Sequence, residues 1–260
     1  MSIKDMKHRI NSIKSIRQIT KAVGLVSSTR LQRLRTKFES SRQFFLQIEN
    51  LNVSSNFFCQ PKNKRCVILV ASDKGLCGSY NLNIGRFAVD LYREKENSVL
   101  MIIGSSGAEI VRRNNITPDR IFTNVNENSV AEIADSAISH FHNDYEIYLT
   151  YTKFYSAVKT VPTYKKILPL TKTKSDVIFE PDEKTVVDFF IPNYVRASIS
   201  AAVLEASVCE QSTRMMNMNA ATENANEMIS NLVLKYNRLR QNQITQELTE
   251  IIGGADALND

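Results

Sequence analysis

The chain has 260 residues, 43% of them hydrophobic, and a formal net charge of +6 at pH 7. This composition allows one medium-sized domain with appendages, and the low numbers of Gly (8) and Pro (6) favour long elements with few loops. No apolar stretch approaches the ~18–20 residues that span a bilayer, and because basic residues interrupt the start we expect no signal peptide. We therefore expect a soluble protein with only indirect membrane association.

The first 60 residues predict one long helix. Apolar residues recur at steps of three and four from Ile3 to Leu34, and only Gly24 interrupts the pattern before Pro61. The first 42 residues also carry eleven basic side chains against only Asp5 and Glu39. Such a cationic stripe suits nucleic acid, an anionic membrane or an acidic protein, or is simply the solvated face of the helix. Because no phosphate-binding module accompanies it, we favour an acidic protein partner.

The middle of the chain, residues 61–192, alternates short β-rich runs with helical stretches. Strands are predicted at 66–71, 99–103, 145–151 and 165–170, and helices at 81–94, 104–113 and 130–141. Strands that alternate with helices indicate an α/β domain with a Rossmann-like, mostly parallel sheet.

The end of the chain predicts a second long helix. From Asn193 to Ile252 there is neither Pro nor Gly, and the run stops at Gly253-Gly254. A helix of about 60 residues is ~90 Å long, which exceeds the diameter of a domain of this size, so most of it must pack on something else. The two long helices are expected to form an antiparallel coiled coil. The domain organisation is then 1–60 and 193–260 as coiled-coil helices, with 61–192 as a globular α/β foot.

The predicted α/β domain raises the possibility of a nucleotide site. The turn Gly104-Ser105-Ser106-Gly107 follows a strand and opens a helix, as phosphate-binding turns do. It lacks the third glycine of the dinucleotide fingerprint, and no G-x-x-x-x-G-K-[ST] loop is present. Glycine serves strand-to-helix geometry alone here, so we expect no cofactor.

The sequence offers few candidate residues for metal binding or acid–base catalysis. Cys59, Cys66, Cys77 and Cys209 lack zinc-site spacing, although Cys59 and Cys66 are close enough in sequence to pair under oxidation. The sequence has three histidines in all, and two of them, His140 and His142, fall at a predicted helix end, where a solvated cap is the simpler interpretation than a metal site. We therefore expect no catalytic residues and no metal.

Three separated segments resemble the γ subunit of F-type ATP synthases. The run Ile10–Val23, which contains Ile19-Thr20-Lys21-Ala22, is similar to the family's opening helix, and Ser72-Asp73-Lys74-Gly75-Leu76-Cys77-Gly78 is similar to its S-D-R-G-L-C-G turn. The segments from Glu210 to Ala225 and from Tyr236 to Ala255 resemble its terminal helix. The chain departs from the family at Val23, where Met is usual, and at the Gly24 that follows.

The resemblance implies a non-catalytic rotor shaft whose coiled coil threads the ring of α and β subunits. Its partners would be α, β, the ε subunit and the membrane sector's c-ring, with no nucleic acid and no insertion into the membrane. Family knowledge assigns the β contacts to Arg240, Gln241, Thr245, Glu247, Lys21, Arg30, Arg33, Arg35 and, more weakly, Arg214. Rotation would couple transmembrane ion flow to ATP synthesis or hydrolysis.

Two other hypotheses predict different behaviour. A basic coiled-coil protein that binds nucleic acid, or acts as a scaffold, would use the cationic stripe and would show salt-dependent DNA affinity. A small nucleotide-dependent enzyme would bind nucleotide saturably as an isolated chain. For the shaft, a start at Met1 favours the cytoplasmic face of a bacterial membrane, with the matrix face of the mitochondrial inner membrane as the alternative.

Overall fold

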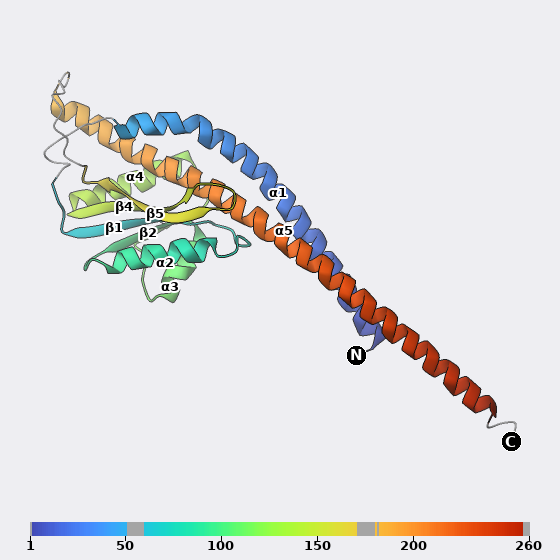
Figure 1. Cartoon of the computed structure of the whole chain (residues 1–260). Coiled ribbons are helices and arrows are strands. Elements are labelled where there is room, and N and C mark those ends of the chain that lie inside the picture. The colour runs from blue at the N-terminus through green and yellow to red at the C-terminus, as the bar shows by residue number, and fades with distance from the viewer. Residues whose placement is uncertain (1, 51–59, 171–179, 181, 257–260) are drawn as a thin grey trace. The chain divides into compact units, whose positions relative to one another are not determined.

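A computed structural model describes residues 2–50, 60–170, 180 and 182–256 (Figure 1). The chain divides into two compact units, one of Met1–Val26 with Met215–Asp260 and the other of Ser27–Arg214. Both long helices, α1 (Ile3–Asn50) and α5 (Glu183–Asp256), contribute residues to each unit. The division into 1–60, 61–192 and 193–260 remains a prediction from sequence.

The unit of Ser27–Arg214 is built around a five-stranded sheet. Its strands are β1 (Lys64–Val70), β2 (Val99–Ile103), β3 (Arg120–Phe122), β4 (Tyr145–Phe154) and β5 (Thr160–Leu168). The spatial order is β3-β2-β1-β4-β5, and every neighbouring pair is parallel except β4 and β5. The predicted mostly parallel α/β sheet is confirmed.

Helices cover both faces of this sheet (Figure 1). On one face Val67 and Leu69 of β1 pack with α2 (Tyr80–Arg93) and α3 (Ser105–Arg113). On the other face Cys66 and Ile68 pack with α4 (Glu127–His142) and the first part of α5. Successive side chains of a strand point to opposite faces, so a strand buried on both sides is apolar at every position. This explains the uninterrupted run of apolar residues in β1.

Two strands differ from the sequence prediction. Strand β3 was not predicted, because it has only three residues and two of them are exposed. Strand β5 begins at Thr160 and not near 165, and Pro162 lies within it. A proline lacks the N–H that a central strand needs, but β5 is at the edge of the sheet, where that loss is tolerated.

The start of α5 was also placed too late. The helix begins at Glu183, about ten residues before the predicted start, and Pro192 lies inside it. Asp182 caps this start, since its Oδ1 accepts the backbone N–H of Thr185 at 2.9 Å and its Oδ2 the hydroxyl of Thr185 at 2.7 Å. Val187 and Ile191 pack in the core, and this packing keeps the chain helical on both sides of Pro192. From the sequence alone a proline indicates a helix boundary. At the other end α5 runs through Gly253 and Gly254 to Asp256.

In the unit of Met1–Val26 and Met215–Asp260, α1 and α5 pair in antiparallel fashion. The Arg17 guanidinium donates to Asn226 Oδ1 at 3.3 Å, and the Thr222 hydroxyl donates to the Thr20 hydroxyl at 2.8 Å. A Cβ built on Gly24 would lie 3.1 Å from Asn219 Oδ1. Residue numbers thus rise along α1 as they fall along α5, which confirms the predicted contact between the terminal helices.

The buried positions of this pair follow a heptad repeat. Alternating steps of four and three relate a set of less exposed residues on each helix, which are Met6, Ile10, Ile13, Arg17, Thr20 and Gly24 on α1 and Met218, Thr222, Ala225, Ile229, Leu232, Tyr236 and Leu239 on α5. Such spacing keeps one seam facing the partner helix. The sequence did not show a clean heptad on α1, because Arg17, Thr20 and Gly24 interrupt its hydrophobicity. Gly24, which interrupts the apolar pattern, is a close-packed seam position.

Several apolar residues of this unit face away from the seam. Ile16, Ile19 and Val26, which the apolar pattern assigned to the buried stripe, are 53%, 61% and 53% exposed. None of the helices in the described ranges is long and apolar enough to cross a membrane. The exposure of Ile16, Ile19 and Val26 itself makes these side chains candidates for contact with a partner.

Candidate functional surfaces

The carboxyl edge of the parallel sheet is where α/β folds usually bind ligands. Here the carboxylate of Asp73, in the turn after β1, occupies that edge. Its Oδ1 accepts the N–H of Ser105 at the start of α3 at 3.0 Å, and its Oδ2 accepts the N–H of Asn124 at 2.9 Å. A helix N-terminus is an anion site, and this one already holds an anion from the chain itself.

The cavity directly against the strand ends is small. A cavity of about 110 Å³ lies between the strand ends and α5, lined among others by Ser72, Asp73, Tyr80 and Glu210. Ligand sites for drug-sized molecules are roughly 300–1,000 Å³, so a nucleotide does not fit there. The glycine turn that raised the possibility of a nucleotide site therefore serves geometry, since a Cβ at Gly104 would lie 2.5 Å from the carbonyl oxygen of Ala71.

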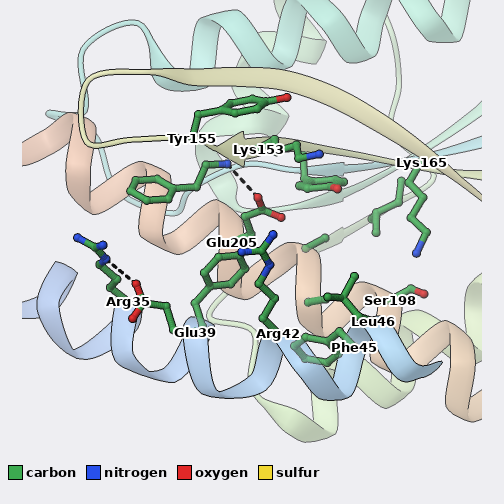
Figure 2. Close-up of a pocket in the computed structure, with 16 residues that line it drawn as sticks. Arg35, Glu39, Arg42, Phe45, Leu46, Lys153, Tyr155, Lys165, Ser198 and Glu205 are labelled. Carbon is green, nitrogen blue, oxygen red and sulfur yellow. Dashed lines mark hydrogen bonds and ion pairs between the residues drawn. The ribbon is translucent and has the colours of Figure 1, made fainter. Parts of the chain in front are cut away.

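A larger cavity of about 380 Å³ lies between α1, the β4–β5 hairpin and α5 (Figure 2). Figure 2 shows Arg35 and Glu39 at one end of it and Lys165 at the other. The Arg35 guanidinium binds Glu39 at 2.8 Å, and Glu205 Oε1 accepts the backbone N–H of Phe154 at 2.9 Å. The lining contains neither His nor Cys, so it offers no Ser–His or Cys–His pair.

Cysteine and histidine give no reactive centre in the parts of the chain that are described. Cys66, Cys77 and Cys209 are buried free thiols, and burial raises the pKa of each. His140 Nε2 lies 3.0 Å from Asp119 Oδ2, so it is tied to a neighbouring loop and is not simply a solvated cap. The described residues hold no group of three or more His, Cys, Asp or Glu side chains able to bind a metal. The suggested Cys59–Cys66 pairing involves Cys59, which lies outside the described residues.

The predicted partner contacts near the end of α5 are all exposed. Gln241, Thr245 and Glu247 make bonds only to their own helix, such as Thr245 Oγ1 to Gln241 O at 3.0 Å and Gln243 Nε2 to Glu247 Oε1 at 2.8 Å. Arg240 has no partner among the described residues. Extending the antiparallel register beyond Arg17 and Asn226 places the start of α1 beside residues near 239 of α5. The predicted contact residues therefore lie where α5 continues past the first residues of α1.

Exposed apolar residues share this side of α5. Ile244, Leu248, Ile251 and Ile252 are 46%, 54%, 67% and 61% exposed. At about 3.6 residues per turn, all four fall on the same side of the helix as Arg240 and Gln241. We call this set of residues, with Thr245 and Glu247, the α5 contact face. Large apolar groups exposed to water, beside polar groups that bond only within their own helix, mark an interaction surface.

The predicted cations of α1 are exposed as well. Lys21, Arg30 and Arg33 have no partner among the described residues, whereas Arg35 is paired with Glu39. Arg214 differs from all of them, because its side chain is 7% exposed and its guanidinium binds the carbonyl oxygens of Lys74 and Gly75. The expected contacts of all these residues with a β subunit stay predictions.

These features define a class of protein: an α/β domain with long, paired terminal helices, one of which carries an exposed apolar face near its end. The ATP synthase family profile matches residues 2–258. The ATP synthase gamma chain of Clostridium perfringens strain SM101 is 36% identical over 274 residues, with 97% of each chain covered. That of Clostridium botulinum strain Hall is 35% identical over 272 residues, covering 97% of this chain and 96% of the relative.

Solved structures share the fold. A chain in the Euglena gracilis mitochondrial ATP synthase (OSCP/F1/c-ring, rotational state 3) matches with a TM-score of 0.76 at 16% identity, covering 98% of this chain and 94% of its own. A chain in the Tetrahymena thermophila central stalk/c-ring structure matches with a TM-score of 0.62 at 24% identity, covering 78% and 99%. The chain belongs to the ATP synthase gamma chain family and is the non-catalytic, central-stalk rotor subunit. Family membership decides against the nucleic-acid-binding alternative.

Proposed function

We propose that this chain drives the catalytic cycle by contacting the β subunits through the α5 contact face and the cations of α1. Arg240 and Gln241 would bind an acidic loop of one β subunit, since a guanidinium beside an amide suits a carboxylate pair. Thr245 and Glu247 would complete that surface. Lys21, Arg30, Arg33 and Arg35 would lie near acidic, moving parts of β. No direct β contact is proposed for Arg214, whose donors are engaged within the chain.

The observation that carries this proposal is the exposure of the α5 contact face. Ile251 and Ile252 are more than half exposed, and the polar groups beside them bond only within their own helix. The free energy of removing this apolar area from water, about 25 cal/mol per Å², is available only to a partner. A ring of subunits that encloses this part of α5 would bury this apolar area and so be stabilised by it.

The mechanism follows from the asymmetry of a single shaft among several catalytic subunits. Each β subunit would meet a different side of the coiled coil, so its open and closed states would be biased by different contacts. This is a coupling free energy between distant sites. The α/β domain would join ε and the c-ring, on the cytoplasmic face of a bacterial membrane, and ion flow there would turn the shaft.

The experiment mixes this chain with purified α and β subunits and measures assembly and ATP hydrolysis. We expect a stoichiometric complex with fast hydrolysis. Arg240→Ala should lower kcat by about tenfold, which corresponds to ~1.4 kcal/mol, because a charge-assisted bond is lost. Lys235→Ala removes an exposed cation of the same helix that lies off the contact face, and it should leave kcat unchanged. A chain that neither assembles nor stimulates hydrolysis contradicts the proposal, and equal effects of the two variants contradict the assigned contact.

A further inference from the structure

The turn after β1 projects three exposed residues, Lys74, Gly75 and Leu76, from the carboxyl edge of the sheet. Leu76 is 64% exposed and has a left-handed backbone with φ of 62°. That conformation costs a non-glycine residue about 1 kcal/mol, so the surroundings must hold it in place. An apolar side chain kept outward on a strained backbone indicates a turn whose shape is fixed.

One half of the turn is held from the sheet. The Asp73 carboxylate accepts the backbone N–H groups of Ser105 and Asn124, as described above, and the Ser105 hydroxyl donates to the carbonyl oxygen of Asp73 at 3.0 Å. The Ser72 hydroxyl donates to the carbonyl oxygen of Lys74 at 2.8 Å. These bonds connect the turn to the starts of the segments after β2 and β3.

The other half is held from α5, and a single side chain does this. The Arg214 Nε donates to the carbonyl oxygen of Gly75 at 3.1 Å, and its Nη2 donates to the carbonyl oxygens of Lys74 and Gly75, each at 3.0 Å. Glu210, one helical turn earlier, pairs with the guanidinium and balances its buried charge. The planar fork of arginine fixes two consecutive carbonyl directions at once, which an ammonium does not do.

We propose that Arg214 is a positioning residue that locks the exposed turn Asp73–Gly78 to helix α5, so that the turn and the helix move as one piece. It acts through the backbone of the turn and touches no partner itself. In the shaft proposed above, this lock would keep the outward surface at Leu76 in a constant orientation relative to the turning helix. That last consequence rests on the proposed function, whereas the lock itself is a property of the isolated chain.

Cys77 reports on the lock without any partner subunit. It is 2% exposed, its thiol lies 3.8 Å from the carbonyl oxygen of Lys74, and it accepts the Asn81 amide at 3.3 Å. Opening of the turn would expose this thiol, while Cys66, fully buried in β1, would be exposed only by unfolding of the sheet. Pulse labelling of the full-length chain with N-ethylmaleimide, followed by peptide mass spectrometry, gives both rates in one sample.

Arg214→Met and Arg214→Lys are compared with the wild type. We expect each to raise the ratio of Cys77 to Cys66 labelling by about tenfold, since the lysine keeps the charge opposite Glu210 but cannot hold both carbonyls. The control Arg196→Met removes another ion-paired arginine of α5, the partner of Asp135, and should leave the ratio unchanged.

Two results would overturn the proposal: an unchanged rate of Cys77 labelling in both Arg214 variants, or equal acceleration at Cys77 and Cys66 in both, which would assign Arg214 to general stability. If the methionine variant fails to fold, the lysine variant alone decides by the same two criteria. Because no α or β subunit is present, the outcome does not depend on whether the shaft assembles.

Discussion

Two regions of helix α5 have opposite environments. Between Val195 and Cys209 many side chains of α5 are buried, with Val195, Ile199, Val208 and Cys209 all at 0% exposure. From Gln241 to Ile252 every residue is exposed, including the four apolar residues of the α5 contact face. The first region is stabilised by the rest of the chain, whereas the second has only bonds within its own helix. Isolated helices of about this length are marginal in water, so a partner would stabilise the second region.

The largest expected difference is between matched apolar truncations in the two regions. Ile199→Ala should lower the free energy of unfolding by about 2–5 kcal/mol, because it leaves a cavity in a fully buried core. Leu248→Ala removes a similar side chain from the α5 contact face and should change it by less than about 0.5 kcal/mol. Urea denaturation of the free chain measures both. Similar losses at the two sites would mean that the contact face is already packed within the chain.

The same comparison can be made between a partly buried carboxylate of the sheet, Glu146, and an exposed one on α5, Glu247. Glu146 accepts the ammonium of Lys166 at 2.8 Å and that of Lys95 at 3.4 Å. Burial works against ionisation, but the bonds and charges of Lys166 and Lys95 outweigh it and hold the pKa of Glu146 below its ordinary 4.5. Glu146→Gln should therefore cost about 1–3 kcal/mol of unfolding free energy at pH 7.

The pH dependence has a defined sign. A carboxyl whose pKa is lowered by folding stabilises the fold above the unfolded value and loses that contribution as pH falls through the folded value. The gap between wild type and Glu146→Gln should hold above pH 4.5 and shrink below it. Glu247→Gln, on the exposed end of α5, should change stability by less than about 0.5 kcal/mol at pH 7. A gap for Glu146 that does not shrink in acid would rule out the charged pairing as its cause.

The smallest effect is expected at the seam of the helix pair. A Cβ at Gly24 would meet Asn219 Oδ1 at 3.1 Å and Met218 Cβ at 3.5 Å. Asn219 is exposed, so its amide has room to turn away. Gly24→Ala should then stabilise the chain by up to about 1 kcal/mol through helix propensity. A leucine side chain is too large for the space between Gly24 and α5, so Gly24→Leu should destabilise the chain. Loss of stability in the alanine variant, read from urea midpoints, would mean that the backbones are closer than the structure has them.

The sequence predicted the layers of the α/β domain because burial on both faces leaves continuous apolar runs, as in Val67–Val70. It did not predict β3, which is too short for a pattern, or the helical start at Glu183, where core packing of Val187 and Ile191 overrides Pro192. On α1 it assigned Ile16 and Ile19 to the buried side, because hydrophobicity alone does not indicate that Thr20 and Gly24 form the seam.

The candidate contacts were predictable only through family resemblance. Composition and spacing give no reason to choose Arg240 over other exposed cations of α5, and its exposure becomes informative only beside the exposed Ile244 and Leu248. The role of Arg214 could not be deduced from sequence, since its bonds to Lys74 and Gly75 join residues about 140 positions apart.

Amide hydrogen exchange of α5, compared between the free chain and the chain assembled with α and β subunits, tests the central claim most directly. We expect residues 240–252 to exchange rapidly in the free chain and to be strongly protected in the assembly. Residues 195–209 should be protected in both states, which provides an internal reference. Protection of residues 240–252 that is the same with and without α and β would contradict the claim that this face is completed by the catalytic ring.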